Sequence, residues 1–301
     1  MQWRPCAILS GVQQMVSPAA RRLRLGVEVR ALREQADLTG LDLAREAGVD
    51  RTALSRIEHG ERRPLDLILK ILDKLLPDDA VRYAELVRVA RDGINRGWWE
   101  RPEYAGMGER QARTADLECG IVLGRLYQNV LPPGLLQAES YARYRAEVAV
   151  REGAQLDIEG TVRGRKRRQE VLKDPGVRLD VILEPQAIDR EYAPGKVVHE
   201  QLMHLYDVAT HNSSVSIRVL PVRAKFDTGY APRSPFEIFS YRDPGDMTLV
   251  RVDTVDADKL ITSPAEAARY VQLHTQMTRA ALSKTVSARM IYEAASNAAG
   301  S

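Results

Sequence analysis

The chain has 301 residues, of which 44% are hydrophobic and 28% charged, and its net charge is +3. This length allows two domains, and the composition is that of a globular protein rather than a disordered or fibrous one. No stretch approaches the apolar run of about 18 residues that a membrane helix needs, so we expect no membrane partner. The small positive charge permits nucleic-acid binding but does not argue for it, because the basic residues must also be clustered.

The N-terminus carries a short apolar stretch but lacks the long apolar core and the cleavage site of a signal peptide. We interpret residues 1–14 as a disordered extension ahead of Met15. The two cysteines, Cys6 and Cys119, lie far apart in the sequence. We therefore expect no structural disulfide and a cytoplasmic, nucleoid-associated protein.

Residues 15–91 predict an all-α bundle. Ser17 and Pro18 carry the signals of a helix start, and that helix ends near Asp37. Thr39 and Asp50 cap two short helices over 40–47 and 51–58, and amphipathic helices follow over 65–76 and 79–90. The segment 92–113 has four glycines and no sustained periodicity, so we interpret it as a linker that its Trp98-Trp99 pair anchors to one domain.

Residues 114–301 predict a larger α+β domain. Alternating apolar and polar residues indicate strands over 178–184, 214–222, 236–241 and 248–254, with helices around them. Because the strands do not alternate regularly with helices, we expect a mainly antiparallel sheet. The predicted fold class is an N-terminal all-α helix-turn-helix bundle followed by this α+β domain.

Residues 39–60 meet the demands of a helix-turn-helix in one stretch without a gap. Ala44 supplies the small side chain where two helices cross, and Gly48 supplies the positive φ of the turn. Apolar residues occupy every position expected to face the core, namely Leu43, Ala47, Val49, Leu54 and Ile57. The remaining positions are polar and should face outward.

In complexes of this motif the N-terminal part of the third helix enters the major groove. Arg51 is the candidate for reading guanine, because its planar fork matches O6 and N7 bidentately. Thr52 and Ser55 can meet a base edge or a thymine methyl. The predicted phosphate contacts, where charge or a helix N-terminus faces the DNA backbone, are Thr39, Arg56, Arg62 and Arg63.

The segment LREQADLTGLDLAREAGVDRTALSRIEHGERRP, residues 32–64, closely resembles XRE-family, phage-repressor-like DNA-binding domains. The resemblance implies a structural ion pair between Arg33 and Glu58. The family usually has glutamine at the position of Gly40, where it contacts phosphate or base, so that contact should be absent here. A single bundle offers a modest surface, and we therefore expect a homodimer on double-stranded operator DNA with two-fold symmetry.

The order of segments from Trp98-Trp99 through VLPPGLLQAESYAR to SPFEIFSY resembles a set of actinobacterial, antitoxin-like XRE regulators with a C-terminal domain of unassigned function. The most specific segment is PGLLQAESYAR, residues 133–143. The resemblance implies a transcriptional regulator whose C-terminal domain senses a partner protein or an effector. The alternative is an antitoxin-like protein that sequesters a small partner protein and regulates its own synthesis.

The larger domain shows no reaction chemistry. It has no Gly-rich phosphate loop, no Cys-x-x-Cys pair, no HExxH and no nucleophile elbow. His199 and His204 are five residues apart and do not share a helix face as paired metal ligands would. We therefore expect no metal, no cofactor and no catalytic residues, and a recruited enzyme is the third alternative. The basic run 163–168 is interpreted as a solvated helix face rather than a second nucleic-acid patch.

Overall fold

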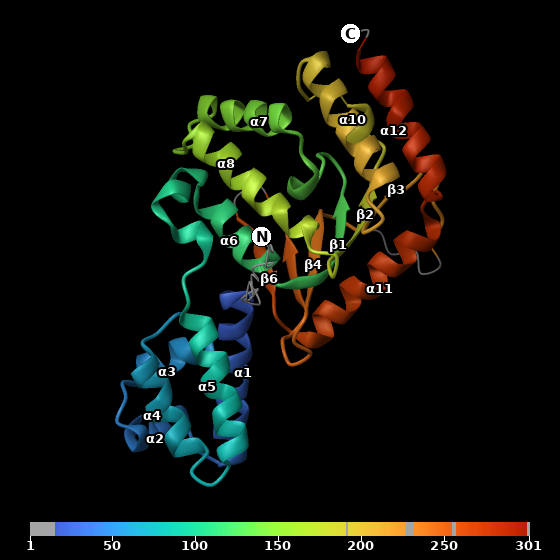
Figure 1. Cartoon of the computed structure of the whole chain (residues 1–301). Coiled ribbons are helices and arrows are strands. Elements are labelled where there is room, and N and C mark those ends of the chain that lie inside the picture. The colour runs from blue at the N-terminus through green and yellow to red at the C-terminus, as the bar shows by residue number, and fades with distance from the viewer. Residues whose placement is uncertain (1–15, 191, 227–231, 255–256, 300–301) are drawn as a thin grey trace, which may run out of the picture.

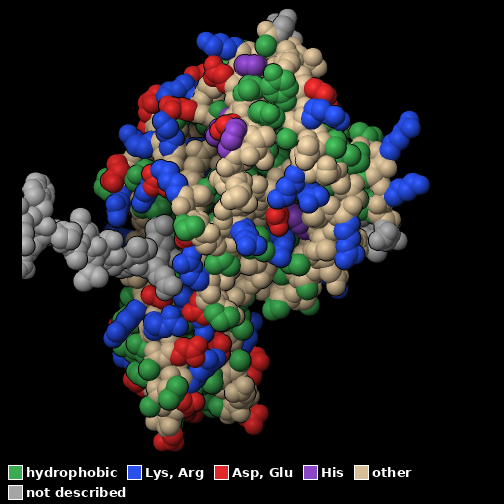
Figure 2. Space-filling model, turned by 45° about the vertical axis from the view of Figure 1, so that its right-hand side comes forward, with side chains coloured by type: hydrophobic (Ala, Val, Ile, Leu, Met, Phe, Trp, Pro, Cys, Tyr) green, Lys and Arg blue, Asp and Glu red, His purple; other side chains and the backbone are tan. Residues whose placement is uncertain are grey.

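The computed structural model describes residues 16–190, 192–226, 232–254 and 257–299. The predicted disordered extension, with Cys6 in it, lies outside these residues. Figure 1 shows two parts, a small helical bundle and a larger part built around one sheet. In Figure 2 the bundle is the narrow lower lobe, and basic and acidic side chains alternate over the face in view. None of the described helices is long and apolar enough to cross a bilayer.

The helical part has five α-helices, and four of them begin with a capping side chain. Ser17 Oγ accepts a hydrogen bond from the Ala20 amide at 3.0 Å, and Asp79 caps the last helix. The apolar sides of all five helices share one core, with Leu43, Ile71 and Leu86 fully buried. The helices are α1 (Pro18–Gln35), α2 (Gly40–Ala47), α3 (Arg51–Glu58), α4 (Leu65–Leu75) and α5 (Ala80–Ile94).

Two short 3₁₀ helices, η1 (Trp98–Glu100) and η2 (Pro102–Met107), connect α5 to α6 (Glu109–Glu118). Trp99 is 6% exposed and packs with Met107 and with Ala115 of α6. Trp98 meets Tyr104 edge to face, with 4.7 Å between ring centroids. The tryptophan pair therefore holds this segment against α6.

Six strands form one mixed sheet in the order β3-β2-β1-β4-β5-β6. β1 pairs in parallel with β2, and β2 with β3, while the other three pairs are antiparallel. The sheet is therefore mostly antiparallel, as predicted, and the strand pattern did not indicate its parallel half. The strands are β1 (Ile121–Gln128), β2 (Arg178–Leu183), β3 (Val215–Val219), β4 (Phe236–Tyr241), β5 (Leu249–Val252) and β6 (Lys259–Ile261).

The parallel pairs follow from the helices that connect their strands, because a crossover returns the chain to the edge where the previous strand began. Between β1 and β2 the crossover contains η3 (Gly134–Leu136), α7 (Glu139–Arg151), α8 (Ile158–Gln169) and η4 (Glu170–Lys173). Between β2 and β3 it contains α9 (Gln186–Asp189) and α10 (Gly195–His211).

Helices cover both faces of the sheet. Alternate residues of a strand point to opposite faces, so Leu126 and Val181 belong to the core with α10 and α12 (Lys284–Ala298), whereas Tyr127 and Ile182 belong to the core with α11 (Pro264–Ala280). Figure 1 shows α11 on one side of the sheet and α7, α8, α10 and α12 on the other. The sheet is thus the middle of three layers.

Helix α1 packs both in the helical bundle and against the larger part of the molecule. Its first turn buries Ala20 against Leu117, Ile121 and Phe239 of the larger part. Asp116 of α6 accepts hydrogen bonds from Ser17 Oγ and from the Ala19 amide, both at 2.9 Å. In Figure 1, α1 starts beside the sheet and runs down into the bundle. The position of the bundle is therefore fixed at the N-terminal end of α1.

Candidate nucleic-acid interface

Thr39 and Asp42 form a capping box at the start of α2. Thr39 Oγ1 accepts a hydrogen bond from the Asp42 amide at 3.2 Å, and Asp42 Oδ2 accepts one from the Thr39 amide at 3.3 Å. These bonds satisfy amides that the helix itself leaves free. The hydrogen bonds from Thr39 also lower the pKa of the Asp42 carboxyl. Thr39, a predicted phosphate contact, is thus an exposed capping residue.

The turn between α2 and α3 depends on Gly48 and Asp50. Gly48 has a φ of 62°, a conformation that glycine adopts without a steric penalty. Asp50 caps α3 by accepting hydrogen bonds from the Thr52 amide at 2.8 Å and the Ala53 amide at 3.1 Å. These bonds, that from Ala53 first, lower the pKa of Asp50. Leu54 on the inner side of α3 is fully buried, so the helix has one fixed outer face.

The outer face of α3 brings together four of the predicted DNA contacts: Arg51, Thr52, Ser55 and Arg56. Within the described residues, the Arg51 side chain makes no ion pair and no hydrogen bond. It lies across Gly40, because a Cβ built there would stand 2.9 Å from Arg51 Cζ and Nε. The missing side chain at position 40 therefore makes room for the arginine at the start of α2.

Arg33 and Glu58 form the ion pair that the family resemblance implies. Arg33 Nε donates to Glu58 Oε1 at 2.7 Å, and Arg33 Nη1 donates to the Leu38 carbonyl at 2.9 Å. The bond to Glu58 raises the pKa of Arg33. Close packing accompanies the pair, since a Cβ at Gly26 would stand 2.7 Å from the carbonyl oxygens of Ile57 and Glu58. These contacts hold the end of α3 against α1.

The other two predicted phosphate contacts are engaged within the chain. Arg62 donates to both carboxylate oxygens of Glu100, at 2.8 and 2.6 Å, and to the Asn95 carbonyl at 3.1 Å. Arg63 donates to Glu61 at 2.9 Å. Arg62 therefore ties the loop after α3 to the end of α5 and to η1, and it must exchange partners to bind a phosphate.

A buried ion-pair network fixes the interface relative to the larger part, and the sequence analysis missed it. Arg21 Nη1 lies 2.7 Å from Asp243 Oδ2 and 3.3 Å from Asp246 Oδ1, and Arg24 Nη1 lies 3.3 and 3.6 Å from the same two carboxylates. The side chains of Arg21 and Asp246 are 2% and 3% exposed. Burial would raise the pKa of Asp243, but hydrogen bonds from Arg21 and the Gly245 amide hold it below its usual range.

Signals for this network were present in the sequence. One is the cluster of arginines at 21, 22 and 24 in the first helix, and the other is the Asp-Pro-Gly-Asp turn at 243–246 between two strands. No local pattern joins these segments, which lie more than 200 residues apart.

The basic run 163–168 is only in part the solvated helix face that its composition predicts, because Arg168 is buried and Arg165 is half-buried. Arg168 is 6% exposed, and its guanidinium donates to both oxygens of Glu118, at 2.7 and 2.6 Å. Arg165 Nε is shielded from solvent and has no hydrogen-bond partner. Arg163 and Lys166 are exposed, as predicted for the whole run. Elsewhere in the described ranges, no cluster of His, Cys, Asp and Glu is suited to hold a metal ion.

Comparison with known protein families separates the two parts of the chain. A family described as a domain of unknown function (DUF5753) matches residues 112–293, which is more than half of the chain. The chain belongs to the DUF5753 family. A helix-turn-helix domain matches residues 24–95, ahead of the DUF5753 domain, and indicates a DNA-binding regulator. No curated protein and no solved structure matches the chain.

Proposed function

We propose that this protein is a sequence-specific transcriptional regulator of the XRE type, whose DUF5753 domain senses a partner protein or an effector. The observation that carries the proposal is the outer face of α3. It presents Arg51, which has no hydrogen-bond or ion-pair partner among the described residues, on a helix that is capped and packed in one orientation. An arginine in this state pairs with a guanine edge without first giving up another bond.

The proposal includes a homodimer on operator DNA and no catalytic activity. One α3 reaches few base pairs, and specific affinity requires more contacts than one such helix offers. A two-fold dimer presents two α3 helices to successive major grooves, roughly 34 Å apart. The DUF5753 domain then acts through the α1 contact, which joins it to the bundle.

The test compares Arg51→Ala with Arg91→Ala, an exposed arginine of α5 in the same bundle. DNA sites are first selected from a random duplex library with the full-length protein, and Kd is then measured by fluorescence anisotropy at fixed salt. We expect Arg51→Ala to lose about 1–3 kcal/mol, or roughly 5- to 150-fold in Kd, and to relax the preference at one base pair. Arg91→Ala should bind as the unsubstituted protein does. Unchanged affinity and preference for Arg51→Ala would contradict the proposed docking.

One observation favours the antitoxin-like alternative, in which the DUF5753 domain sequesters a small partner protein. β6 is an edge strand of the sheet, and its Leu260 is 38% exposed. Such an edge can accept a strand from another chain. Co-purification with the product of the adjacent gene, lost on Leu260→Pro, would support this role. Absence of a complex at micromolar concentrations would exclude it.

A further inference from the structure

A cavity of about 410 Å³ lies in the larger part, between the sheet and helices α6, α7 and α8. The segment 131–137, which contains the start of PGLLQAESYAR, forms part of its wall. Apolar side chains line one portion, among them Leu131, Ala146 and Leu156. Charged and amide side chains line the rest. The volume falls within the range of small-molecule sites, about 300–1,000 Å³.

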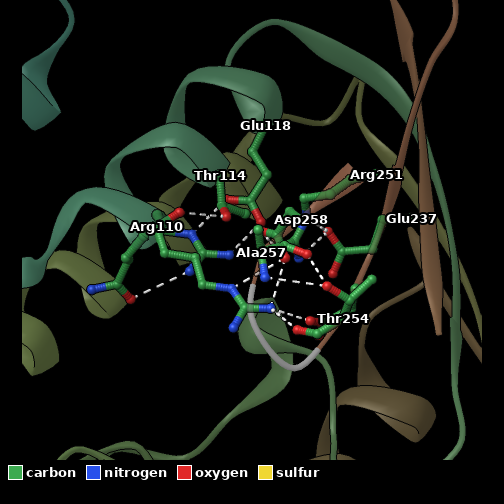
Figure 3. Close-up of polar contacts among 11 residues, drawn as sticks. Arg110, Thr114, Glu118, Glu237, Arg251, Thr254, Ala257 and Asp258 are labelled. Carbon is green, nitrogen blue, oxygen red and sulfur yellow. Dashed lines mark hydrogen bonds and ion pairs between the residues drawn. The ribbon is translucent and has the colours of Figure 1, made fainter. Parts of the chain in front are cut away.

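Most charges at this cavity are neutralised by partners. Arg251 donates to Glu237 at 2.7 Å and to Asp258 at 2.8 Å, and Arg110 donates to Asp258 at 2.6 Å. Figure 3 shows this network on the sheet side, with the Arg110 guanidinium reaching from α6 toward Asp258 and Thr254. Arg168 is neutralised by Glu118. These groups form a rigid and electrically balanced wall.

Arg165, which is half-buried with its Nε shielded from solvent, is the exception among the arginines of this wall. It lines the cavity, and within the described residues it makes no ion pair and no hydrogen bond. Burial, and then the neighbouring Arg168, lower the pKa of Arg165 to about 9. A second arginine, Arg145 of α7, lines the same cavity and has no ion-pair partner in the described part of the chain. Two half-buried arginines without a carboxylate partner among the described residues therefore face one cavity, and such a pair favours a ligand of opposite charge.

Two further polar groups of the wall are unsatisfied. The side-chain oxygens of Gln137 and Thr161 are shielded from solvent and have no hydrogen-bond partner. Gln137 is held in place because its amide nitrogen donates to the Pro132 carbonyl at 2.8 Å. Gly134 makes room for the arginine, since a Cβ there would clash with Arg165 Nη1. Buried polar groups are normally satisfied. Of the three unsatisfied groups, Arg165 Nε and the Thr161 hydroxyl can donate to an anion, whereas Gln137 Oε1 can only accept a hydrogen bond from a donor group or a water.

We propose that this cavity binds a small organic anion, whose carboxylate or phosphate pairs with Arg165 and whose apolar body packs against Leu131, Ala146 and Leu156. Arg145 lines the same cavity and adds to the positive charge that attracts the anion. If the protein is the regulator proposed above, on which this step rests, the anion is its effector. The route to the bundle is α6, whose Gln111 and Thr114 line the cavity and whose Asp116 binds the start of α1.

The binding test uses the full-length protein with three anionic probes, octanoate, octyl phosphate and inorganic phosphate, and with 1-octanol as the uncharged control. Isothermal titration calorimetry should show saturable binding of octanoate or octyl phosphate, weaker binding of inorganic phosphate and none of 1-octanol. Arg165→Gln should weaken the binding at least tenfold, and Arg163→Gln, on the exposed side of the same helix, should leave it unchanged. Gly134→Ala should weaken it as well, because the added methyl displaces the Arg165 guanidinium.

Lack of saturable binding by all three anions, or equal binding by the Arg165→Gln variant, would overturn the proposal. A measurement of thermal stability distinguishes a binding role of Arg165 from a purely structural one. Arg165→Met removes an uncompensated charge, so the unliganded variant should melt at the same or a higher temperature than the unsubstituted protein. A markedly lower Tm would show that Arg165 supports the fold, and would count against the site.

The anion-binding experiment can succeed or fail whether or not the protein is a regulator. Anion binding with no DNA binding by any variant would leave the cavity assigned and contradict the regulator. DNA binding without anion binding would contradict the cavity alone. If both occur, a saturating anion should change the Kd for DNA in the unsubstituted protein, but not in Arg165→Gln.

Discussion

At the scale of single residues, His274 of α11 is a titratable group placed where it cannot easily take up a proton. Its side chain is 2% exposed and packs beneath the sheet. Burial lowers the pKa of His274 to about 4, and the charged groups that face it are Asp180, which opposes this shift, and Arg125, which adds to it. Thr278, one turn further along α11, lies beside the imidazole. The side chain is therefore neutral at pH 7.

This placement predicts a specific loss of stability in mild acid. The unfolded chain takes up the proton near pH 6.5 but the folded one resists until about pH 4, so the free energy of unfolding falls between these values as pH is lowered. The expected slope from this one group is about 1.4 kcal/mol per pH unit. Urea titrations at several pH values should give a shallower slope for His274→Gln than for the unsubstituted protein. His211→Gln, at an exposed position, should keep the original slope, and equal slopes for both variants would refute the assignment.

The residues of α3 show what the sequence could predict at this scale. The exposed positions follow from helical spacing, which is a local signal. The pair Arg33–Glu58 joins two helices 25 positions apart, and only the family resemblance implied it. The packing of Arg51 across Gly40 could not be predicted from the sequence, since it depends on how closely α2 and α3 approach each other. From the sequence, glycine at position 40 predicted only the loss of the DNA contact that the family's glutamine makes.

At the scale of secondary-structure elements, α2 depends on its capping box. Thr39→Ala removes the cap and should lower the free energy of unfolding by about 1 kcal/mol, within a range of 0.5–2. Thr39→Ser keeps the hydroxyl and should retain most of the stability. Thermal melts followed by circular dichroism would compare the two. If Thr39→Ala were as stable as Thr39→Ser, the box would be incidental to the helix.

The helices of the bundle were predictable because caps and apolar spacing are local signals. The parallel strands β1, β2 and β3 were not, because the pairing direction depends on where the crossover helices return the chain. The prediction that the basic run of α8 is fully exposed to solvent was wrong in part for a related reason. Its composition resembles a solvated face, but Glu118, 50 residues earlier, withdraws Arg168 from solvent.

At the scale of the whole molecule, Asp243 and Asp246 hold the bundle against the sheet. The double substitution Asp243→Asn and Asp246→Asn leaves Arg21 and Arg24 without these two carboxylates. Loss of a partner from a buried pair costs about 3–5 kcal/mol, so hydrogen exchange should increase in α1 and around the turn 243–246. Asp174→Asn, which breaks an exposed pair with Arg242, is the matched control and should change little. Equal protection in both variants would mean that apolar contacts alone fix the bundle.

The ion pairs between the first helix and the turn 243–246 could not be predicted from the sequence. Arg21 and Asp243 are 222 positions apart, and the chain contains 41 Asp and Glu residues with which Arg21 could pair in principle. Tertiary packing alone selects the pair. The candidate anion site had the same difficulty, because its wall comes from three strands, three helices and the segment 131–137, which no periodicity connects.

The shared helix α1 limits how the DNA-binding module can be transplanted. A chimera that replaced the bundle up to the linker would delete Ser17 and Ala20. It would leave Asp116 unsatisfied and expose the apolar patch around Leu117 and Phe239. New binding preferences are therefore expected to arise by exchange of α3 surface residues inside a retained scaffold, and hybrid regulators should be grafted within residues 39–60.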